Sequence, residues 1–546
     1  MNKLRIGFDF DNTIVSYESL FYDLAIEKEY FQKEHNVPKI KSVVKELLIN
    51  QDGHDLRWRE LQSLAYGKEI TKAQPFPNAI SVISELKKQE HDLFIVSHKT
   101  EYSNYQKGVN LRKVARNWIK LNQVDIKEEN VFFCETIEKK IDKVSQLRLD
   151  FFFDDLLKVL QHNNWPEHTQ GIHFLPKGES DHKMHLLSWD HMLPILQNDK
   201  LGKLQEIEPI KRDGNNRITK LSFGDKTEII KSYFITKGEK KERGLLEFSA
   251  CKILWENNIK NIPRPIKFNP KLNVALYDYI EGDQIEAHNI PSNDLVKAMS
   301  TFIEQSKSIY RTNNLENYFE AADSRQSFRD YTDIIDSRFN SIINGSSQNS
   351  LFSHVTNFLQ KKVLPLKEII FKNFLCKLSK SSYSLEVKFS KNERTLSPSD
   401  FGPHNMLIDK KGTYQFLDFE YFGQDDAAKL ISDIFHHAGF QLSKAQKWMI
   451  YDDYVQNSPE DRFFQERFSL AIDLIGLEWV LIVLNIASPG SLERRVFANP
   501  NLDVKTLITT RLQKAEQMVE RYEQFVKKDN IFLTIPEPSY AKLCRL

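Results

Sequence analysis

Residues 6–13 read IGFDFDNT, an apolar run that ends in two aspartates separated by a single residue. Short runs of branched and aromatic residues with little polar alternation are typical of a strand that is buried on both faces. Asp9 and Asp11 stand where this strand ends. In open parallel sheets, ligands bind beyond the carboxyl ends of the strands. The segment therefore predicts an α/β fold whose binding crevice receives two carboxylates.

Three later runs repeat this pattern within the first 195 residues. HDLFIVSH, NVFFCE and LDFFFDD, at residues 91–98, 130–135 and 149–155, are also short, apolar and rich in aromatic or branched side chains. Residues 77–89 read PNAISVISELKKQ and have apolar side chains at the spacing of a crossover helix. Strands that alternate with helices predict a doubly wound parallel sheet. We place this α/β domain at residues 1–195.

A helical insert of about residues 16–74 separates the first strand from the regular alternation. An insert at this point falls over the carboxyl end of the sheet, where domains of this kind bind their ligands. We therefore expect the insert to form a cap over the binding crevice.

Two neighbouring carboxylates suit two-step chemistry on a phosphate ester. One can attack phosphorus to form an aspartyl phosphate, and the other can protonate the leaving oxygen and then help to activate water. Clustered carboxylates repel one another and the phosphate, so such a site needs Mg²⁺. It also needs a hydroxyl and a cation on the phosphoryl oxygens. Ser97, which ends LFIVS, and the lysines of EKKIDK at residues 138–143 are candidates.

At these residues the first domain resembles the haloacid dehalogenase-like hydrolases, which are mainly phosphatases, over roughly residues 1–190. The resemblance implies a role for each residue of the site: Asp9 as nucleophile, Asp11 as general acid/base, Ser97 as phosphate ligand, Lys140 as the site lysine, and Asp154 with Asp9 and Asp11 as the Mg²⁺ ligands. Asp155 is a second candidate for the metal-binding acid. Lys139 and Lys143 compete with Lys140 for the role of the lysine.

A second acidic segment, LSPSDFGPHNMLID, occupies residues 396–409. Asp400 stands five residues ahead of Asn405, and Asp418 follows both in GTYQFLDFE. This order and spacing match the catalytic aspartate and the two metal ligands of a kinase. The intervening residues predict a hairpin that returns Asp418 to Asn405. Phosphoryl transfer from ATP needs little more than such an acid, metal ligands and a cation on the nucleotide.

Upstream residues supply the remaining parts of a kinase. Lys231, late in a predicted strand, suits the phosphate-binding cation, and Glu247 on the following helix suits its partner. GNNR, which contains Asn216, predicts a turn over the nucleotide. This half resembles the aminoglycoside phosphotransferase and choline kinase-like family from about residue 205 to 525. The resemblance implies a two-lobed α+β protein-kinase fold that uses ATP and Mg²⁺.

The chain departs from that family at one position. Members usually carry His two residues ahead of the catalytic aspartate, whereas this chain carries Pro398. That histidine supports the loop, so its replacement removes no catalytic group. His404, His436 and His437 raise the question of a metal site, but adjacent histidines on a helix point to different sides. We expect them to cap or line the lobe, and we expect Asp433 to brace the catalytic loop.

The composition narrows the classes of function. The chain has 546 residues with 76 basic and 75 acidic side chains, a balance unlike that of a dedicated nucleic-acid-binding protein. Four cysteines without CxxC spacing argue against a zinc or disulfide framework and fit a reducing compartment. The apolar stretch 470–487 contains two acids and predicts a buried helix, not a membrane span. Because no apolar signal core opens the sequence, we expect a cytoplasmic location.

These observations predict a bifunctional enzyme with domains at residues 1–195 and 205–525. The first would hydrolyse a small-molecule phosphate ester, and the second would transfer phosphate from ATP to a small-molecule alcohol. Sugars, polyols or related metabolites, such as precursors of polysaccharides, fit both chemistries. The alternative is a phosphatase fused to a non-catalytic, kinase-like regulatory domain that binds ATP or another ligand. The oligomeric state stays open.

Overall fold

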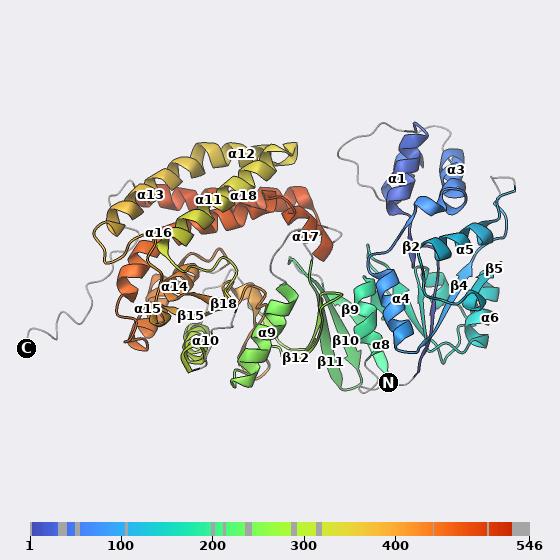
Figure 1. The fold of residues 1–546 in the computed structure, drawn as a ribbon, viewed down its shortest axis with the longest axis horizontal. Helices are drawn as coiled ribbons and strands as arrows, with labels where there is room; N and C mark the ends of the chain where they lie inside the picture. The colour runs from blue at the N-terminus through green and yellow to red at the C-terminus, as the bar shows by residue number, and fades with distance from the viewer. Residues whose placement is uncertain are drawn as a thin grey trace, which may run out of the picture. The chain divides into compact units, whose positions relative to one another are not determined.

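The computed structural model describes residues 3–30, 41–49, 55–103, 108–197, 203–210, 214–234, 243–285, 292–312, 319–439, 442–499 and 502–526. Two compact units make up the chain (Figure 1). The first unit consists of Met1–Lys211 and Arg217–Ser232, and the second of Arg212–Asn216 and Tyr233–Leu546. The limits 1–195 and 205–525 remain a prediction, because compactness alone does not define where a folding domain ends.

A six-stranded parallel sheet forms the centre of the first unit. Its strands, in spatial order, are β5 (Val131–Cys134), β4 (Asp92–His98), β1 (Arg5–Phe8), β6 (Phe151–Asp154), β7 (Gln170–Phe174) and β8 (His185–Leu186). All neighbouring pairs are parallel. The four strands predicted from apolar runs are β1, β4, β5 and β6, and the predicted doubly wound α/β fold is confirmed.

Successive residues of β1 and β6 point to opposite faces of this sheet. Phe8 and Phe153 stack at 5.4 Å on one face, where Trp189 also packs on Phe8. On the other face, a Cβ on Gly7 would lie 2.4 Å from a side-chain carbon of Leu149, so only glycine fits there. Helices α4 (Ala79–Lys88) and α6 (Ile137–Gln146) lie on opposite sides of the sheet (Figure 1).

The insert after β1 is helical. It contains α1 (Glu18–Glu27), α2 (Lys41–Ile49) and α3 (Asp55–Tyr66), and β2 (Val15–Ser16) pairs with β3 (Gln74–Pro75) at its base. Aromatic contacts hold its helices together. Tyr17 meets Tyr66 at 4.6 Å between ring centroids, and Phe21 stacks on Trp58 at 4.9 Å.

Three antiparallel strands complete the first unit: β9 (Leu204–Ile210), β10 (Arg217–Phe223) and β11 (Lys226–Ser232). A buried histidine ties this sheet to the segment that follows β8. His191 Nδ1 lies 2.8 Å from the Thr219 hydroxyl, and His191 Nε2 lies 2.7 Å from the Ser232 hydroxyl. Ile207 of β9 also forms a bridge with Met184. The unit therefore combines a parallel and an antiparallel sheet.

The second unit is mostly helical. Its helices are α9 (Arg243–Glu256), α10 (Asn293–Thr312), α11 (Phe328–Ser347), α12 (Ser353–Phe358), α13 (Leu364–Leu378), α14 (Ala427–His436), α15 (Lys444–Gln456), α16 (Phe464–Leu484), α17 (Ser491–Ala498) and α18 (Val504–Val526). Its strands are β12 (Pro265–Asn269), β13 (Val274–Asp278), β14 (Asp283–Gln284), β15 (Arg394–Ser397), β16 (Met406–Ile408), β17 (Tyr414–Phe416) and β18 (Gly423–Asp426). This mixture of helices and short antiparallel ladders agrees with the predicted α+β class.

Helix α16 is the centre of this helical part and contacts α11, α13, α14 and α18. Within the described residues, Phe464–Ala487 is the one segment long and apolar enough to cross a membrane, but 83% of its apolar 18-residue window is buried inside the structure. Its Arg467 is fully buried and donates to both oxygens of Asp461, at 2.7 and 2.9 Å, and to Asp426 at 3.1 Å. These features are those of a core helix, as we predicted for residues 470–487.

The buried imidazole of His191 predicts a pH-dependent stability. Burial lowers its pKa to about 4, below the ordinary value of 6.5 that applies in the unfolded chain. The unfolded state therefore binds more protons between these values, so stability is fully present above pH 6.5 and falls as pH decreases toward 4. Glutamine does not titrate, so we expect the free energy of unfolding of His191→Gln to fall less over this pH range than that of the wild type. The expected difference is on the order of 2–3 kcal/mol. Urea unfolding at pH 7 and pH 4.5 measures the difference, and parallel losses in both proteins would contradict it.

Candidate active sites

The first site lies at the carboxyl ends of β1 and β6. Because these neighbouring strands are parallel, with Phe8 opposite Phe153, the residues that follow emerge side by side. Asp9 N donates to Phe153 O at 2.8 Å, which fixes Asp9 against Asp154. The Lys140 ammonium lies between the two carboxylates, 2.6 Å from Asp9 Oδ1 and 2.5 Å from Asp154 Oδ2. All three side chains are buried.

Burial shapes the electrostatics of these acids. It raises the pKa of Asp9 to about 7, a shift that Lys140 opposes and Asp154 reinforces. Burial and the nearby Asp9 carboxylate also raise the pKa of Asp155 well above its usual range. Carboxylate oxygens of Asp9, Asp154 and Asp155 all lie within 4.8 Å of one another. Mg²⁺ prefers oxygen ligands such as carboxylates, so the residues fit the expected metal. This group contains the second candidate, Asp155, in place of the predicted ligand Asp11.

Asp11 is held by two groups that the sequence did not single out. Lys99 Nζ lies 2.8 Å from Asp11 Oδ2, and the Tyr17 hydroxyl donates to Asp11 Oδ1 at 2.5 Å. Lys99 directly follows β4 and lies two residues after Ser97. Its position at a strand end was the feature of the sequence that could have identified it as a site residue. Tyr17 precedes α1 of the insert. Burial and the Asp11 charge raise the pKa of Tyr17, which keeps it a donor.

The structure separates the three candidate lysines. Lys140 points into the site, whereas Lys139 Nζ pairs with Glu135 at 2.5 Å and Lys143 Nζ donates to Gln146 at 2.9 Å, both at the surface. Ser97 is buried in β4. The catalytic roles of Ser97 and Lys140 remain predictions, although Lys140 is the lysine that reaches Asp9.

The helical insert adds cationic and aromatic side chains near this site. Lys41 Nζ of α2 donates to the Tyr66 hydroxyl of α3 at 2.8 Å. The Lys99 ammonium lies 5.7 Å from the centre of the Tyr66 ring, close enough for a cation–π contact. Tyr66 of the insert therefore contacts both groups that hold Asp11, the ring of Tyr17 and the ammonium of Lys99.

The second site lies in the second unit, around the segment predicted as a catalytic loop. Strands β16 and β17 form the expected hairpin. It brings Leu417 N within 2.8 Å of Asn405 O, so Asp418 follows directly beside Asn405. Asn405 Nδ2 donates to Asp400 O at 3.0 Å, which leaves its amide oxygen for a metal. Ser399, directly before Asp400, and Asp418 itself both have a φ of +64°. The backbone is therefore in the left-handed region next to the first acid and at the second.

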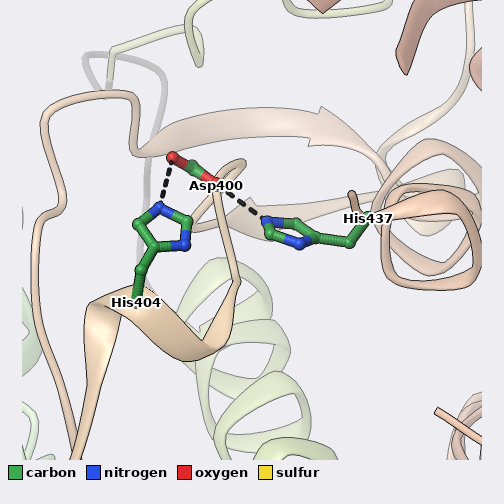
Figure 2. A group of neighbouring side chains, drawn as sticks. All are labelled: Asp400, His404 and His437. Carbon is green, nitrogen blue, oxygen red and sulfur yellow. Dashed lines mark hydrogen bonds and ion pairs between the residues drawn. The ribbon is translucent and has the colours of Figure 1, made fainter. Parts of the chain in front are cut away.

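Two histidines hold the Asp400 carboxylate (Figure 2). His404 Nε2 lies 3.2 Å from Asp400 Oδ2, and His437 Nε2 lies 3.0 Å from Asp400 Oδ1. Burial alone would raise the pKa of Asp400, but these two hydrogen bonds bring it well below its usual range. His436 turns away, and its ring stacks on Tyr522 at 6.0 Å. The adjacent histidines thus point to different sides, as the sequence predicted.

The predicted nucleotide-binding residues are distributed over both units. Asn216, in the second unit, donates to Glu420 Oε2 at 2.9 Å, two residues beyond Asp418. Lys231 is buried in β11 of the first unit, and Glu247 is buried in α9 of the second. Their pairing and their contact with ATP remain predictions.

Asp433, which we predicted to brace the catalytic loop, is held by two buried side chains of the helical part. Its carboxylate accepts hydrogen bonds from Lys429 Nζ at 2.8 Å and from Trp479 Nε1 at 3.0 Å. The Trp479 ring in turn packs on His437 at 4.5 Å between ring centroids. These contacts connect Asp433 to His437 through Trp479, and its bracing of the loop remains a prediction.

No family model matches the chain. The N-terminal 29% is similar to two proteins named as candidate nucleotidases. The one from Bacillus cereus is 23% identical over 162 residues, which cover 79% of that protein. The one from Oceanobacillus iheyensis is 20% identical over 161 residues, again 79% of its length.

Solved kinase structures resemble the larger part of the chain. A Plasmodium vivax ethanolamine kinase aligns with 59% of this chain and 83% of its own, at 16% identity and a TM-score of 0.40. A Streptococcus pneumoniae choline kinase aligns with 61% of this chain and 100% of its own, at 13% identity and a TM-score of 0.39. A spectinomycin phosphotransferase gives 13% identity and a TM-score of 0.37. These values assign neither a substrate nor an activity.

The position of Lys140 leads to a matched test of the first site. We expect Lys140→Gln to lower the hydrolysis of p-nitrophenyl phosphate with Mg²⁺ at least about 100-fold, because the buried carboxylates and the phosphoryl oxygens lose their cation. Lys139→Gln, one residue away and exposed, should stay within about twofold of the wild type, since exposed ion pairs contribute little. Circular dichroism controls for folding. Equal rates in the two variants would show that Lys140 has no part in the reaction.

Proposed function

We propose that the protein is a bifunctional enzyme: a Mg²⁺-dependent phosphomonoesterase with Asp9 as its nucleophile, and an ATP-dependent phosphotransferase with Asp400 as its catalytic acid. The buried group of Asp9, Lys140 and Asp154 is the observation that carries the first activity. Nucleotidases and small-molecule kinases, to which the two parts of the chain are similar, are enzymes of these classes.

The residues of the first site suit the two steps of phosphate ester hydrolysis. Asp9 attacks phosphorus and forms an aspartyl phosphate, while the bond to the leaving oxygen breaks and Asp11 gives that oxygen its proton. Asp11 then takes a proton from water, which attacks the aspartyl phosphate and releases inorganic phosphate and free Asp9. Mg²⁺, held by Asp9, Asp154 and Asp155, would offset the charge on the phosphoryl oxygens. Lys99 and Tyr17 hold Asp11 in place for both proton transfers.

The residues of the second site suit transfer to an alcohol. The acceptor hydroxyl donates to the Asp400 carboxylate and attacks the γ-phosphorus of ATP. The bond to the ADP oxygen breaks, and the hydroxyl proton passes to Asp400. Asn405 and Asp418 would hold Mg²⁺, which shields the charge on the phosphates. The acid and both metal ligands of this step are present in the chain, although Pro398 stands in place of the usual histidine, and Lys231 is the predicted cation on the nucleotide.

The alternative for the second half is a regulatory domain that binds ATP or another ligand without turnover. The hydrogen bonds that lower the pKa of Asp400 are the observation that favours it, because they make the carboxylate a weaker base. The two functions differ in whether phosphate leaves ATP in a reaction that depends on Asp400.

Phosphorus NMR on paired variants tests both activities. The purified protein is incubated with ATP, Mg²⁺ and a panel of sugars, polyols, amino alcohols and their phosphates. Nucleoside monophosphates join the panel because the similar proteins carry the name of nucleotidases. We expect Asp9→Asn to abolish only phosphate release and Asp400→Asn to abolish only transfer from ATP, each by at least about 1000-fold.

Each variant serves as the control for the other, because its intact half must remain active. Phosphate release that persists in Asp9→Asn would exclude the aspartyl phosphate route. ATP binding without any transfer that depends on Asp400 would identify the regulatory alternative.

A further inference from the structure

We propose that His437 is the positioning residue of the catalytic carboxylate: it holds Asp400 Oδ1 from the position directly after helix α14 and leaves Oδ2 for the acceptor hydroxyl. The proposal rests on the phosphotransferase activity proposed above. Pro398 has no side-chain donor, so the support of Asp400 has to come from elsewhere in the fold. The structure supplies it from a residue 37 positions later in the chain.

The hydrogen bonds of His437 define its tautomer. Gly439 N lies 3.0 Å from His437 Nδ1, and a backbone N–H can only donate, so Nδ1 is the acceptor. In a neutral ring the proton is then on Nε2, which donates to Asp400 Oδ1 at 3.0 Å. Burial lowers the pKa of His437, which favours this neutral ring. His437 is therefore oriented as a fixed donor to the carboxylate.

The ring of His437 is also fixed by packing. Trp479 of α16 lies against it at 4.5 Å between ring centroids, and Trp479 Nε1 donates to Asp433 Oδ1 at 3.0 Å. Asp433 is held in turn by the buried Lys429 at 2.8 Å. A series of buried contacts thus runs from the core of the helical part to Asp400. Positioning groups need such rigid support, since a displacement of about 1 Å costs about 100-fold in rate.

Two glycines leave room for this arrangement. A Cβ on Gly402 would lie 2.1 Å from His437 Cε1 and 2.8 Å from His404 Cε1. A Cβ on Gly439 would lie 3.0 Å from His437 Cε1. The backbone of the catalytic loop can approach the imidazole of His437 only because Gly402 carries no side chain.

The two histidines on Asp400 differ in exposure, which suggests different tasks. The His437 side chain is 3% exposed, whereas that of His404 is 52% exposed. If the substrate displaced a buried donor, an unpaired polar group would remain in the protein interior, which is unfavourable. An exposed donor exchanges with solvent or with a ligand. The acceptor hydroxyl therefore takes the place of His404 on Oδ2, and His437 keeps Oδ1.

A metal ion is the other explanation for one aspartate and two histidines whose ligand atoms lie within 4.8 Å of one another. The tautomer of His437 argues against it. A histidine binds a metal through an unprotonated nitrogen, but Nε2 of His437 faces Asp400 with its proton while Nδ1 accepts from Gly439. The arrangement suits a hydrogen-bonded carboxylate and not a metal centre.

The test uses the full chain and a matched pair of substitutions. His437→Gln places an amide N–H near the position of Nε2, whereas His437→Asn places it near Nδ1 and cannot reach Asp400. The rate of ATP hydrolysis is measured with Mg²⁺ and without an added alcohol, so that water serves as the phosphate acceptor. We expect kcat to fall about 100-fold in His437→Asn and less than about tenfold in His437→Gln, with KM for ATP within about threefold in both.

Three results would overturn the proposal. Equal losses in the Gln and Asn variants would show that His437 acts only through packing, and unchanged kcat in His437→Asn would show that it has no role. Stoichiometric zinc in the purified protein, lost in His437→Gln, would establish the metal site instead. Asp400→Asn separates these results from a failure of the proposed phosphotransferase: if Asp400→Asn hydrolyses ATP as fast as the wild type, the activity itself is absent.

Discussion

The Lys140 ammonium between Asp9 and Asp154 is the interaction on which the first site depends. Two carboxylates at neighbouring strand ends lose their hydration and repel each other, and this cation lies within 2.6 Å of an oxygen of each. Its position follows from the fold. Helix α6 begins directly after β5, with Thr136 as its N-cap, and its first turn carries Lys140 under the ends of β1 and β6. The positions of the sheet, of helix α6 and of the Lys140 ammonium therefore depend on one another. A displacement of any of them would leave a buried charge without its partner.

The second site meets a similar constraint with imidazole donors. No lysine among the described residues contacts the Asp400 carboxylate; two imidazoles do, each on its own oxygen. A lysine would neutralise the carboxylate strongly and compete with the acceptor hydroxyl, whereas an imidazole N–H orients it with a single hydrogen bond. The difference matches the two tasks. In the function proposed above, the first site attacks a dianionic phosphoryl group and the second directs one hydroxyl at ATP.

The sequence predicted what depends on strand ends and short spacing. Asp9 and Asp154 each end an apolar run, and the hairpin between Asn405 and Asp418 is local, so both arrangements followed from nearby residues. Spacing alone could not distinguish Lys140 from Lys139 and Lys143, because the face that α6 turns toward the sheet depends on packing. His437 could not be assigned to Asp400, because the contact joins a loop to the end of a helix through tertiary structure. Tyr17 and Lys99 were missed for the same reason: their partner, Asp11, was known, but the path of the insert was not.

His191 binds strands of the β9, β10 and β11 sheet, and this contact limits where the chain could be divided into two separate polypeptides. A fragment that starts at residue 205 would carry Thr219 and Ser232 without the imidazole that lies 2.7–2.8 Å from their hydroxyls. Its partner would keep His191 and lose the hydroxyls. In the sequence, the polar segment between residues 197 and 208 looks like a linker between two domains. A division of the chain there would nevertheless separate the members of a buried hydrogen-bond group. A division in this segment would therefore place the imidazole on one polypeptide and both of its hydroxyl partners on the other.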